Sequence, residues 1–415
     1  MFMFTAYATL FRTPGAVKFS VAGLIGRMPI SMDSLALVFI VVAASDSYAL
    51  AGALSATASI VMSIAVPYWS GVADRIGQRA LLIRAVPFKA AGIILFIVLV
   101  QNNAPIWTWF ASIIVAEASS VNLGGLVRRR WLHVLSPDKS TTTQDQSDRH
   151  LVNAAYSLEA LNDEFVFIVG PIIATACATS ITPAAGLIAG IIFLLIGMPY
   201  FASLRETEPA PSPRHTKDPH PAVIRNKSLQ AIVLPIMFVG GFFGSIAIVT
   251  VAFTDFYGHK LQSGLLLAIW ACGSAVAAVM NGVIKWKYSH AARFIIFLIA
   301  LTVLAIPLLF VHSILTLGLA LFLNGFAIAP LIINAYGVAE SAVPHEQITQ
   351  TLTWVVAGMP LGGALASAVA GWSIDTYGAQ SAYWVPLAFM CAALAATLPY
   401  LTTYSALIGY SSKHD

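Results

Sequence analysis

Charged residues are scarce in this chain. Asp, Glu, Lys and Arg together make up 10% of its 415 residues, whereas hydrophobic residues make up 58%. A soluble domain contains roughly 25% charged residues, so this composition excludes an ordinary water-exposed surface. The mean hydropathy of +0.82 supports the same conclusion. The chain is therefore predicted to lie mostly inside a lipid bilayer, with no separate soluble domain.

Clusters of cysteine and histidine are also lacking. The three cysteines, Cys177, Cys272 and Cys391, lie far apart in apolar stretches, which argues against a disulfide framework and a zinc site. No histidine lies well inside an apolar stretch, and the chain has no Gly-x-x-x-x-Gly-Lys-Ser/Thr loop for binding ATP phosphates. The basic residues lie in short loops, where they indicate orientation. We expect no metal, no cofactor and no nucleic-acid partner.

What the chain does contain is a series of twelve apolar stretches, most of them near or above the roughly 20 residues that a spanning helix requires. A polar break at residues 205–227, rich in proline and charge, divides them six and six. We therefore predict an all-α membrane protein with a first bundle at 1–204, a central loop at 205–227 and a second bundle at 228–415. The twelve stretches are 19–44, 47–69, 81–100, 104–127, 151–178, 183–202, 229–256, 263–283, 294–311, 314–338, 351–374 and 383–404.

Lys and Arg are distributed unequally between the two sides of the predicted membrane. An even number of spans places both termini on one side, and the loops of that side carry nearly all basic residues outside the spans. The loops of the other side contain only Lys260. Because basic loops remain in the cytoplasm, both termini and the central loop are predicted to be cytoplasmic, in a multi-pass protein of the cytoplasmic (inner) membrane.

The loop between the second and third stretches reads GVADRIGQR at residues 71–79. It resembles the signature loop of the major facilitator superfamily, Gly-x-Leu-x-Asp-Arg-x-Gly-x-Arg, with Ser70 at the first glycine position and Val72 at the leucine position. Span number, central loop and topology extend the resemblance over essentially the whole chain. It implies two six-helix bundles related by a pseudo-two-fold axis, a substrate cavity between them and rocking alternating access.

The resemblance also implies a cytoplasmic gate latch in this loop, with the basic residues at the end of the fourth span as its neighbours. A short loop with one acidic and two basic residues can form ion pairs that exist in only one state of a gate. For the fourth-span group 128–130, anchoring at the membrane face is an equal alternative. The predicted gate residues are Gly71, Asp74, Arg75, Gly77, Arg79 and Arg128.

Ionisable residues inside the spans are concentrated in the first half. A charge at the bilayer centre costs roughly 2.5–3.5 kcal/mol on insertion scales, so each such residue is a candidate for function. From the rise of about 1.5 Å per residue, Arg27, Glu117 and Glu159 lie at one depth. Glu159 and Asp163 share a helix face, and Glu164 points about 100° away from Asp163. The candidate proton and substrate pathway consists of Arg27, Asp33, Glu117, Glu159, Asp163 and Glu164.

These charges allow two interpretations. One is a static ion pair that stiffens the bundle, which we favour for Arg27 with Glu117. The other is a protonation site, which we favour for either of the two acids that share a face of the fifth span, because burial disfavours an unpaired charge. Asp33 is a second candidate for the coupling or substrate site. Lys89 is expected to extend toward the cytoplasmic face.

Together with the resemblance, these residues predict a secondary transporter that exports a small solute in exchange for protons. Gly170-Pro171 in the fifth span resembles the core of a motif of the antiporter branch, with Ala174-Thr175 in place of its glycine pair. The alternatives are a proton symporter or facilitator for a sugar, amino acid or other metabolite, and, in a different class, a membrane enzyme or receptor. The expected partners are a small-molecule substrate, protons and the lipid bilayer, and we expect a functional monomer.

Overall fold

The computed structural model describes residues 8–135, 145–211, 227–284, 286–341 and 348–405, and every element of regular structure in them is a helix. Of the predicted central loop, residues 212–226 lie outside the described ranges. The first half contains α2 (Ala16–Ser45), α3 (Tyr48–Ile76), α4 (Gln78–Gln101), α5 (Ile106–Glu117), α6 (Leu123–Leu135), α7 (Asp145–Ser180), α8 (Ala185–Ser203) and η1 (Arg205–Thr207). The second half contains α9 (Lys227–Phe256), α10 (Gln262–Val283), α11 (His290–Ala305), η3 (Ile306–Phe310), α12 (Ile314–Gly325), α13 (Ile328–Ser341), α14 (Ile348–Tyr377), η5 (Ser381–Tyr383), α15 (Trp384–Ala395) and η6 (Leu398–Tyr400).

Ten helical segments of the described chain are long and apolar enough to cross a membrane. The α5–α6 pair and α14 occupy the places of the other two predicted spans, so the helix order is consistent with twelve. The clearest departure from the sequence prediction concerns the fourth span. The sequence predicted a continuous stretch at 104–127, whereas the structure breaks this helix between Glu117 and Leu123 and extends it to Leu135.

Local hydrogen bonding explains the break. Asn122 Oδ1 accepts a hydrogen bond from Gly125 N at 3.0 Å and so caps the start of α6. The residues at 119–121 are Ser, Ser and Val, which have modest helix preference. The carbonyl of Ala118 accepts a hydrogen bond from Trp69 Nε1 of α3 at 2.6 Å. Because lipid offers no hydrogen bonds, a broken helix requires such protein partners.

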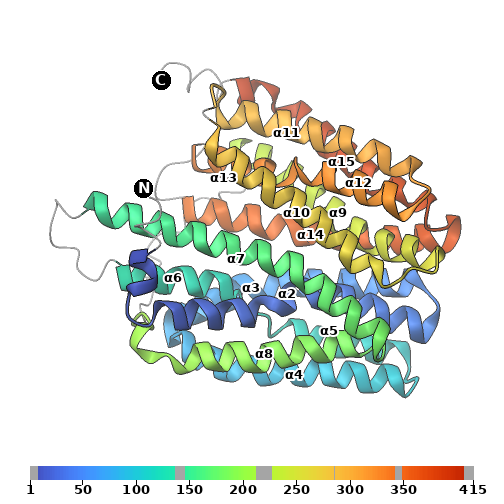
Figure 1. Cartoon of the computed structure of the whole chain (residues 1–415), viewed down its shortest axis with the longest axis horizontal. Coiled ribbons are helices and arrows are strands. Elements are labelled where there is room, and N and C mark those ends of the chain that lie inside the picture. Colours follow the sequence, from blue (N-terminus) through green and yellow to red (C-terminus); the bar gives the residue numbers. More distant parts are fainter. Residues whose placement is uncertain (1–7, 136–144, 212–226, 285, 342–347, 406–415) are drawn as a thin grey trace.

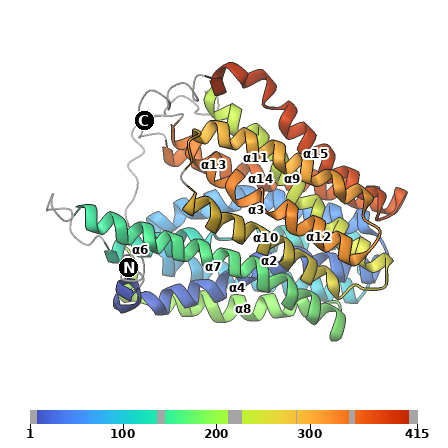
Figure 2. The same ribbon diagram turned by 45° about the horizontal axis from the view of Figure 1, so that its top comes forward.

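The helices form two groups. In Figure 1 the helices of the first half, coloured blue to green, occupy the lower part of the molecule, and those of the second half, yellow to red, occupy the upper part. Figure 2 shows the same division after rotation. The halves meet mainly along two helix pairs, α3 with α14 and α7 with α10, and α9 makes smaller contacts with α2 and α3. The contact between the halves is therefore built mainly from long helices lying side by side.

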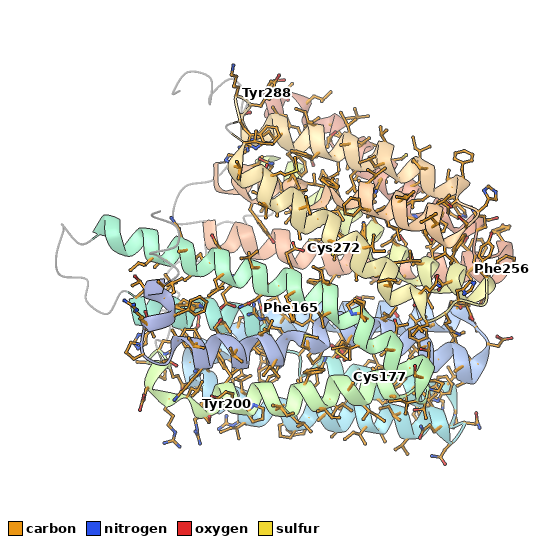
Figure 3. All side chains as sticks on the ribbon, in the orientation of Figure 1. Phe165, Cys177, Tyr200, Phe256, Cys272 and Tyr288 are labelled. Carbon is orange, nitrogen blue, oxygen red and sulfur yellow. The ribbon has the colours of Figure 1, made fainter. Side chains whose placement is uncertain are left out.

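The helices begin and end at two faces of the molecule. We call the face with the start of α2, the end of α8 and the α10–α11 turn the terminal end. We call the face with the α2–α3, α7–α8 and α9–α10 turns the opposite end. In Figure 3, Tyr200 and Tyr288 lie toward the terminal end, and Cys177 and Phe256 toward the opposite end.

Candidate functional site

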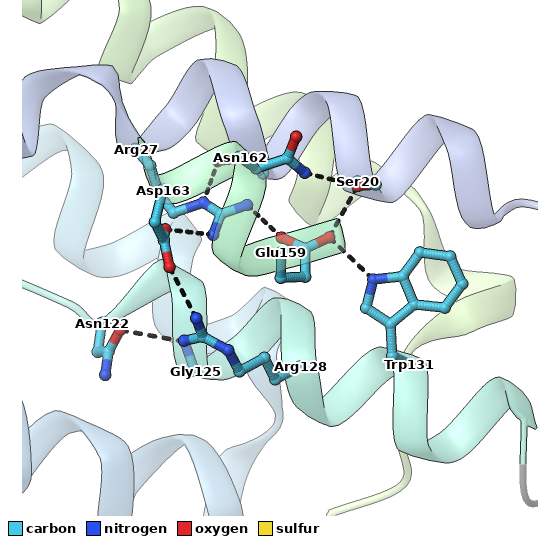
Figure 4. A network of polar contacts seen from close by, with 10 residues as sticks. Ser20, Arg27, Asn122, Gly125, Arg128, Trp131, Glu159, Asn162 and Asp163 are labelled. Carbon is cyan, nitrogen blue, oxygen red and sulfur yellow. Dashed lines mark hydrogen bonds and ion pairs between the residues drawn. The ribbon is translucent and has the colours of Figure 1, made fainter. Parts of the chain in front are cut away.

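A network of charged side chains lies in the first half, between α2, α6 and α7 (Figure 4). Arg27 of α2 is 1% exposed and forms ion pairs with Glu159 and Asp163 of α7. Arg27 Nη1 lies 2.7 Å from Asp163 Oδ1, and Arg128 Nη2 of α6 lies 2.7 Å from Asp163 Oδ2. Two arginines thus meet two carboxylates, and the charges of the network balance.

Glu159 is the most enclosed member of this network. Its side chain is fully buried. Its Oε1 accepts hydrogen bonds from Ser20 Oγ at 2.8 Å and from Trp131 Nε1 at 2.9 Å, while its Oε2 faces Arg27. Both carboxylate oxygens therefore have partners, from α2 and α6, and Glu159 is well placed to hold three helices together.

The structure places these residues partly as the sequence predicted. A cluster of one buried arginine facing two carboxylates is present. The expected pair of Arg27 with Glu117 is wrong, because Glu117 forms its ion pair with Lys89 of α4. Helical rise gives the depth of a residue but does not say which helices are neighbours. Glu164 is partly exposed and forms no ion pair or hydrogen bond within the part of the chain that the structure describes.

A second charged cluster lies between α2, α4 and α5. Lys89 Nζ, midway along α4, is 2.9 Å from Glu117 Oε1 and 3.0 Å from Glu117 Oε2. It is also 3.6 Å from Asp33 Oδ2 of α2. Ser120 Oγ donates a hydrogen bond to Glu117 Oε2 at 2.6 Å. Lys89 therefore points into the bundle, and the prediction that it extends to the membrane face is wrong.

This second cluster has one cation for two carboxylates. Asp33 Oδ1 is buried and has no hydrogen-bond partner among the described residues. It lies against Gly190 of α8, where a Cβ atom would be 2.7 Å away. Glu117 is the last residue of α5, so the cluster sits at a helix end inside the bundle. An excess carboxylate and an unpartnered oxygen distinguish it from the balanced Arg27 network.

The predicted gate loop lies at the terminal end, where α3 passes into α4. Gly77 forms the turn with φ 87°, a backbone conformation that favours glycine. Asp74 of α3 forms an ion pair with Arg129 of α6. Arg128, the residue that the sequence favoured as its neighbour, binds Asp163 instead. Adjacent residues on a helix point about 100° apart, so one step along α6 changes the partner.

Two further residues at the terminal end, Gln78 and Glu208, were not identified from the sequence, and they join Arg130 of the group 128–130 in this region. Arg130 is fully buried, and its Nε donates a hydrogen bond to Gln78 Oε1 at 2.8 Å. Glu208 Oε1 accepts a hydrogen bond from the backbone N of Arg79 at 2.8 Å. These contacts tie the start of α4 to α6 and to the chain after α8. The remaining predicted gate residues, Gly71 and Arg75, are exposed.

The described side chains contain no group of three or more His, Cys, Asp or Glu residues that could hold a metal ion. The three cysteines are free thiols. Cys177 and Cys272 are partly buried, and Cys391 is exposed.

Comparison with known proteins finds one family model and several solved transporter structures that are similar to this chain. A family model described as Major Facilitator Superfamily matches residues 29–316 and 232–409, and no curated protein sequence matches the chain. A mutant of the nucleoside transporter NupG is 12% identical, with a TM-score of 0.72, covering 94% of this chain and 99% of that one. An auto-inhibited POT family peptide transporter is 12% identical, with a TM-score of 0.71 and coverage of 95% and 97%. A bacterial homologue of the iron transporter ferroportin, in an inward-facing state, is 12% identical, with a TM-score of 0.64 and coverage of 92% and 98%.

Proposed function

This chain belongs to the major facilitator superfamily and is a secondary transporter, and from that premise we propose that it exports a small solute in exchange for protons. It has the all-α fold of that family, and it is a transporter rather than an enzyme. The proposal concerns what the family leaves open, namely the coupling ion, the direction of transport and the residues that carry the proton.

The cluster of Asp33, Lys89 and Glu117 is the observation that carries the proposal. Their side chains are 17%, 13% and 10% exposed, respectively, so they lie in a largely water-free environment. An unpaired charge at the centre of a bilayer costs roughly 2.5–3.5 kcal/mol. One ammonium group can neutralise only one of the two carboxylates, and a bound proton would neutralise the other. The cluster therefore has the composition of a site that takes up and releases one proton.

The position of the cluster supports the same role. Glu117 ends α5 at the break in the fourth span, and Ser120, which binds both Glu117 and Lys89, lies within the break. Transporters place substrate and ion sites at interrupted helices near the middle of the membrane, because helix ends there supply unpaired backbone groups. A break can also change shape between states without unwinding a whole helix.

The Arg27 network supports a structural role for its residues, whereas the sequence favoured Glu159 or Asp163 as the proton carrier. Its two arginines and two carboxylates balance, and Glu159 is saturated with hydrogen-bond donors. Buried groups satisfied in this way stabilise one arrangement of helices. We therefore assign Asp33, with Glu117 and Lys89, to proton coupling, and Arg27, Glu159 and Asp163 to holding the first bundle together.

The direction of transport is proposed from the fifth span. Gly170 packs against Ser31 of α2, where any Cβ atom would meet the Ser31 hydroxyl, and Ser31 Oγ donates a hydrogen bond to Val166 O at 2.8 Å. The Gly170-Pro171 pair that resembles the antiporter motif thus makes a close contact with the helix that carries Asp33. Proton-coupled uptake is the alternative, since the similar structures include a nucleoside and a peptide transporter.

The domain boundaries, the orientation in the membrane and the oligomeric state are also proposed. We propose bundles at 1–204 and 228–415 joined by a loop at 205–227, both termini in the cytoplasm, insertion in the cytoplasmic membrane, and function as a monomer. The excess of basic residues in the loops at the terminal end supports this orientation. The gate loop, with its pair of Asp74 and Arg129, would then face the cytoplasm.

Proton movement in everted membrane vesicles tests the proposal. Vesicles that contain the protein are given an acid-inside gradient, and cationic drugs, sugars and amino acids are added one at a time. We expect one class of compound to dissipate the gradient in the parent and in Glu206→Gln, which alters an exposed acid. The same compound should have no effect in Asp33→Asn. No response to any compound would contradict proton exchange, and an unchanged response in Asp33→Asn would contradict the role of Asp33.

A further inference from the structure

A carboxylate of the second half binds the first half at the opposite end. Asp375, near the end of α14, accepts hydrogen bonds from Ser47 Oγ at 2.8 Å, from Tyr48 N at 2.9 Å and from Ala49 N at 2.8 Å. All three donors belong to the start of α3, in the first half. Asp375 is the residue of the second half that receives them.

These donors are the ones that a helix leaves unpaired. The first N–H groups of an α-helix have no partner within the helix, and the helix dipole makes that end positive. Ser47 caps α3 within its own chain segment by accepting a hydrogen bond from Leu50 N. Asp375 completes the capping from the other half of the protein. The N–H groups of Tyr48 and Ala49 therefore have this partner only while α3 and α14 lie together.

A second carboxylate of the second half reinforces this contact. Tyr48 donates its hydroxyl hydrogen bond to Asp255 Oδ2 of α9 at 2.7 Å. Lys260 Nζ lies 2.8 Å from the same Asp255 oxygen, and it also lies 5.9 Å from the ring centre of Phe39 in α2. Tyr48 is thus bonded to two helices of the second half, through its backbone N to α14 and through its hydroxyl to α9.

The backbones of α3 and α14 touch at the same place. A Cβ atom added at Gly371 of α14 would meet the carbonyl of Tyr48, and one added at Gly52 of α3 would meet the carbonyl of Ser367. Only glycine allows this approach, and the approach brings Asp375 within reach of the α3 N–H groups. At the terminal end, by contrast, the ion pair of Asp74 with Arg129 lies within the first half.

We propose that Asp375 and Asp255, with Ser47, Tyr48 and Ala49, form a clasp that holds the opposite end of the transporter shut, and that this clasp must break each time that end opens. The proposal rests on the alternating-access transport proposed above. Loss of a capping side chain shifts a helix equilibrium by up to roughly thirtyfold and commonly by a smaller factor. We expect Asp375→Ala to raise the ratio of open to closed molecules at the opposite end about tenfold.

Distances between spin labels across the opposite end test the clasp directly. The full chain, with its three cysteines replaced by alanine, receives label sites at Ile181→Cys in the first half and His312→Cys in the second, both exposed positions at this end. Double electron–electron resonance then gives the populations of short and long distances in detergent. The matched control is Thr376→Ala, because Thr376 is exposed and, among the described residues, bonds only within its own helix, to Trp372 O at 2.8 Å.

We expect Asp375→Ala, but not Thr376→Ala, to move population from the short to the long distance. Gly371→Ala, which separates the helices without changing a charge, should do the same. If Asp375→Ala does not give a single species on size exclusion, Tyr48→Phe, which removes only the hydroxyl facing Asp255, takes its place with the same expected direction. An unchanged distribution in the folded variant would overturn the clasp. Because no substrate or proton gradient is used, this result is independent of whether Asp33 carries a proton.

Discussion

Replacing Lys89 with methionine removes the only cation that the structure places between Asp33 and Glu117. The ammonium group lies 2.9 Å from Glu117 and 3.6 Å from Asp33, so Lys89→Met leaves two mostly buried carboxylates facing each other. Removing one partner of a buried ion pair costs about 3–5 kcal/mol, and we expect about 3 kcal/mol here. For a cooperative unit the size of one bundle, that corresponds to a fall in Tm of roughly 6–12 °C. Thermal unfolding in detergent, followed by tryptophan fluorescence, measures it.

Two further variants test whether the fall in Tm comes from the loss of the Lys89 ion pair. Arg84→Met removes an exposed cation from the same helix, and we expect it to change Tm by less than about 2 °C. Lys89→Met combined with Glu117→Gln removes one of the two facing charges and should regain about half of the lost stability. A Lys89→Met protein as stable as the parent, or a double variant no more stable than the single one, would show that this ion pair does not hold α2, α4 and α5 together.

The contacts of Glu159 and Asn122 predict the effects of two other substitutions on Tm. Glu159→Gln weakens the ion pair with Arg27 while keeping an acceptor for Trp131, so we expect a Tm lower by roughly 4–8 °C. Substrate-dependent proton movement in vesicles should be retained, in contrast to Asp33→Asn. Asn122→Ala removes the cap of α6, which costs about 1 kcal/mol, or roughly 2–4 °C in Tm. Asn122→Asp should restore that loss, and failure to do so would show that the side-chain oxygen does not act as the cap.

The helices could be predicted from the sequence because a spanning helix is defined by its own length and hydropathy. The stretch predicted at 229–256 corresponds to α9 (Lys227–Phe256), and that at 263–283 corresponds to α10 (Gln262–Val283). The break in the fourth span was missed because Val121, Leu123 and Leu126 continue the apolar pattern past its polar residues. A signal was present, since Asn122 stands where a helix would begin again and follows two serines and a valine. Its meaning depends on Trp69, which lies far away in the sequence and satisfies the Ala118 carbonyl.

The depth of the site residues along their helices could be predicted from the sequence, but their ion-pair partners could not. The rise along each helix correctly brought Arg27 near the level of Glu159. Which residues face each other depends on how the helices are rotated and arranged, so Lys89 rather than Arg27 meets Glu117. The contact of Asp375 with Tyr48, 327 positions apart in the chain, has no local pattern at all. Interactions between helices of different halves depend on the assembled fold and not on the composition of either segment.

The helix α3 connects the features that sequence reasoning treated separately. At its start, Tyr48 binds Asp375 and Asp255 of the second half. Further along, Trp69 donates to the Ala118 carbonyl, next to Glu117 at the helix break. A displacement of α3 at the clasp therefore reaches the break through a hydrogen bond as well as through packing. Because Glu117 holds Lys89, and Lys89 also faces Asp33, such a displacement changes the surroundings of the excess carboxylate. The clasp and the proposed proton site thus both contact α3, and we expect coupling between gate opening and proton release to pass through this helix.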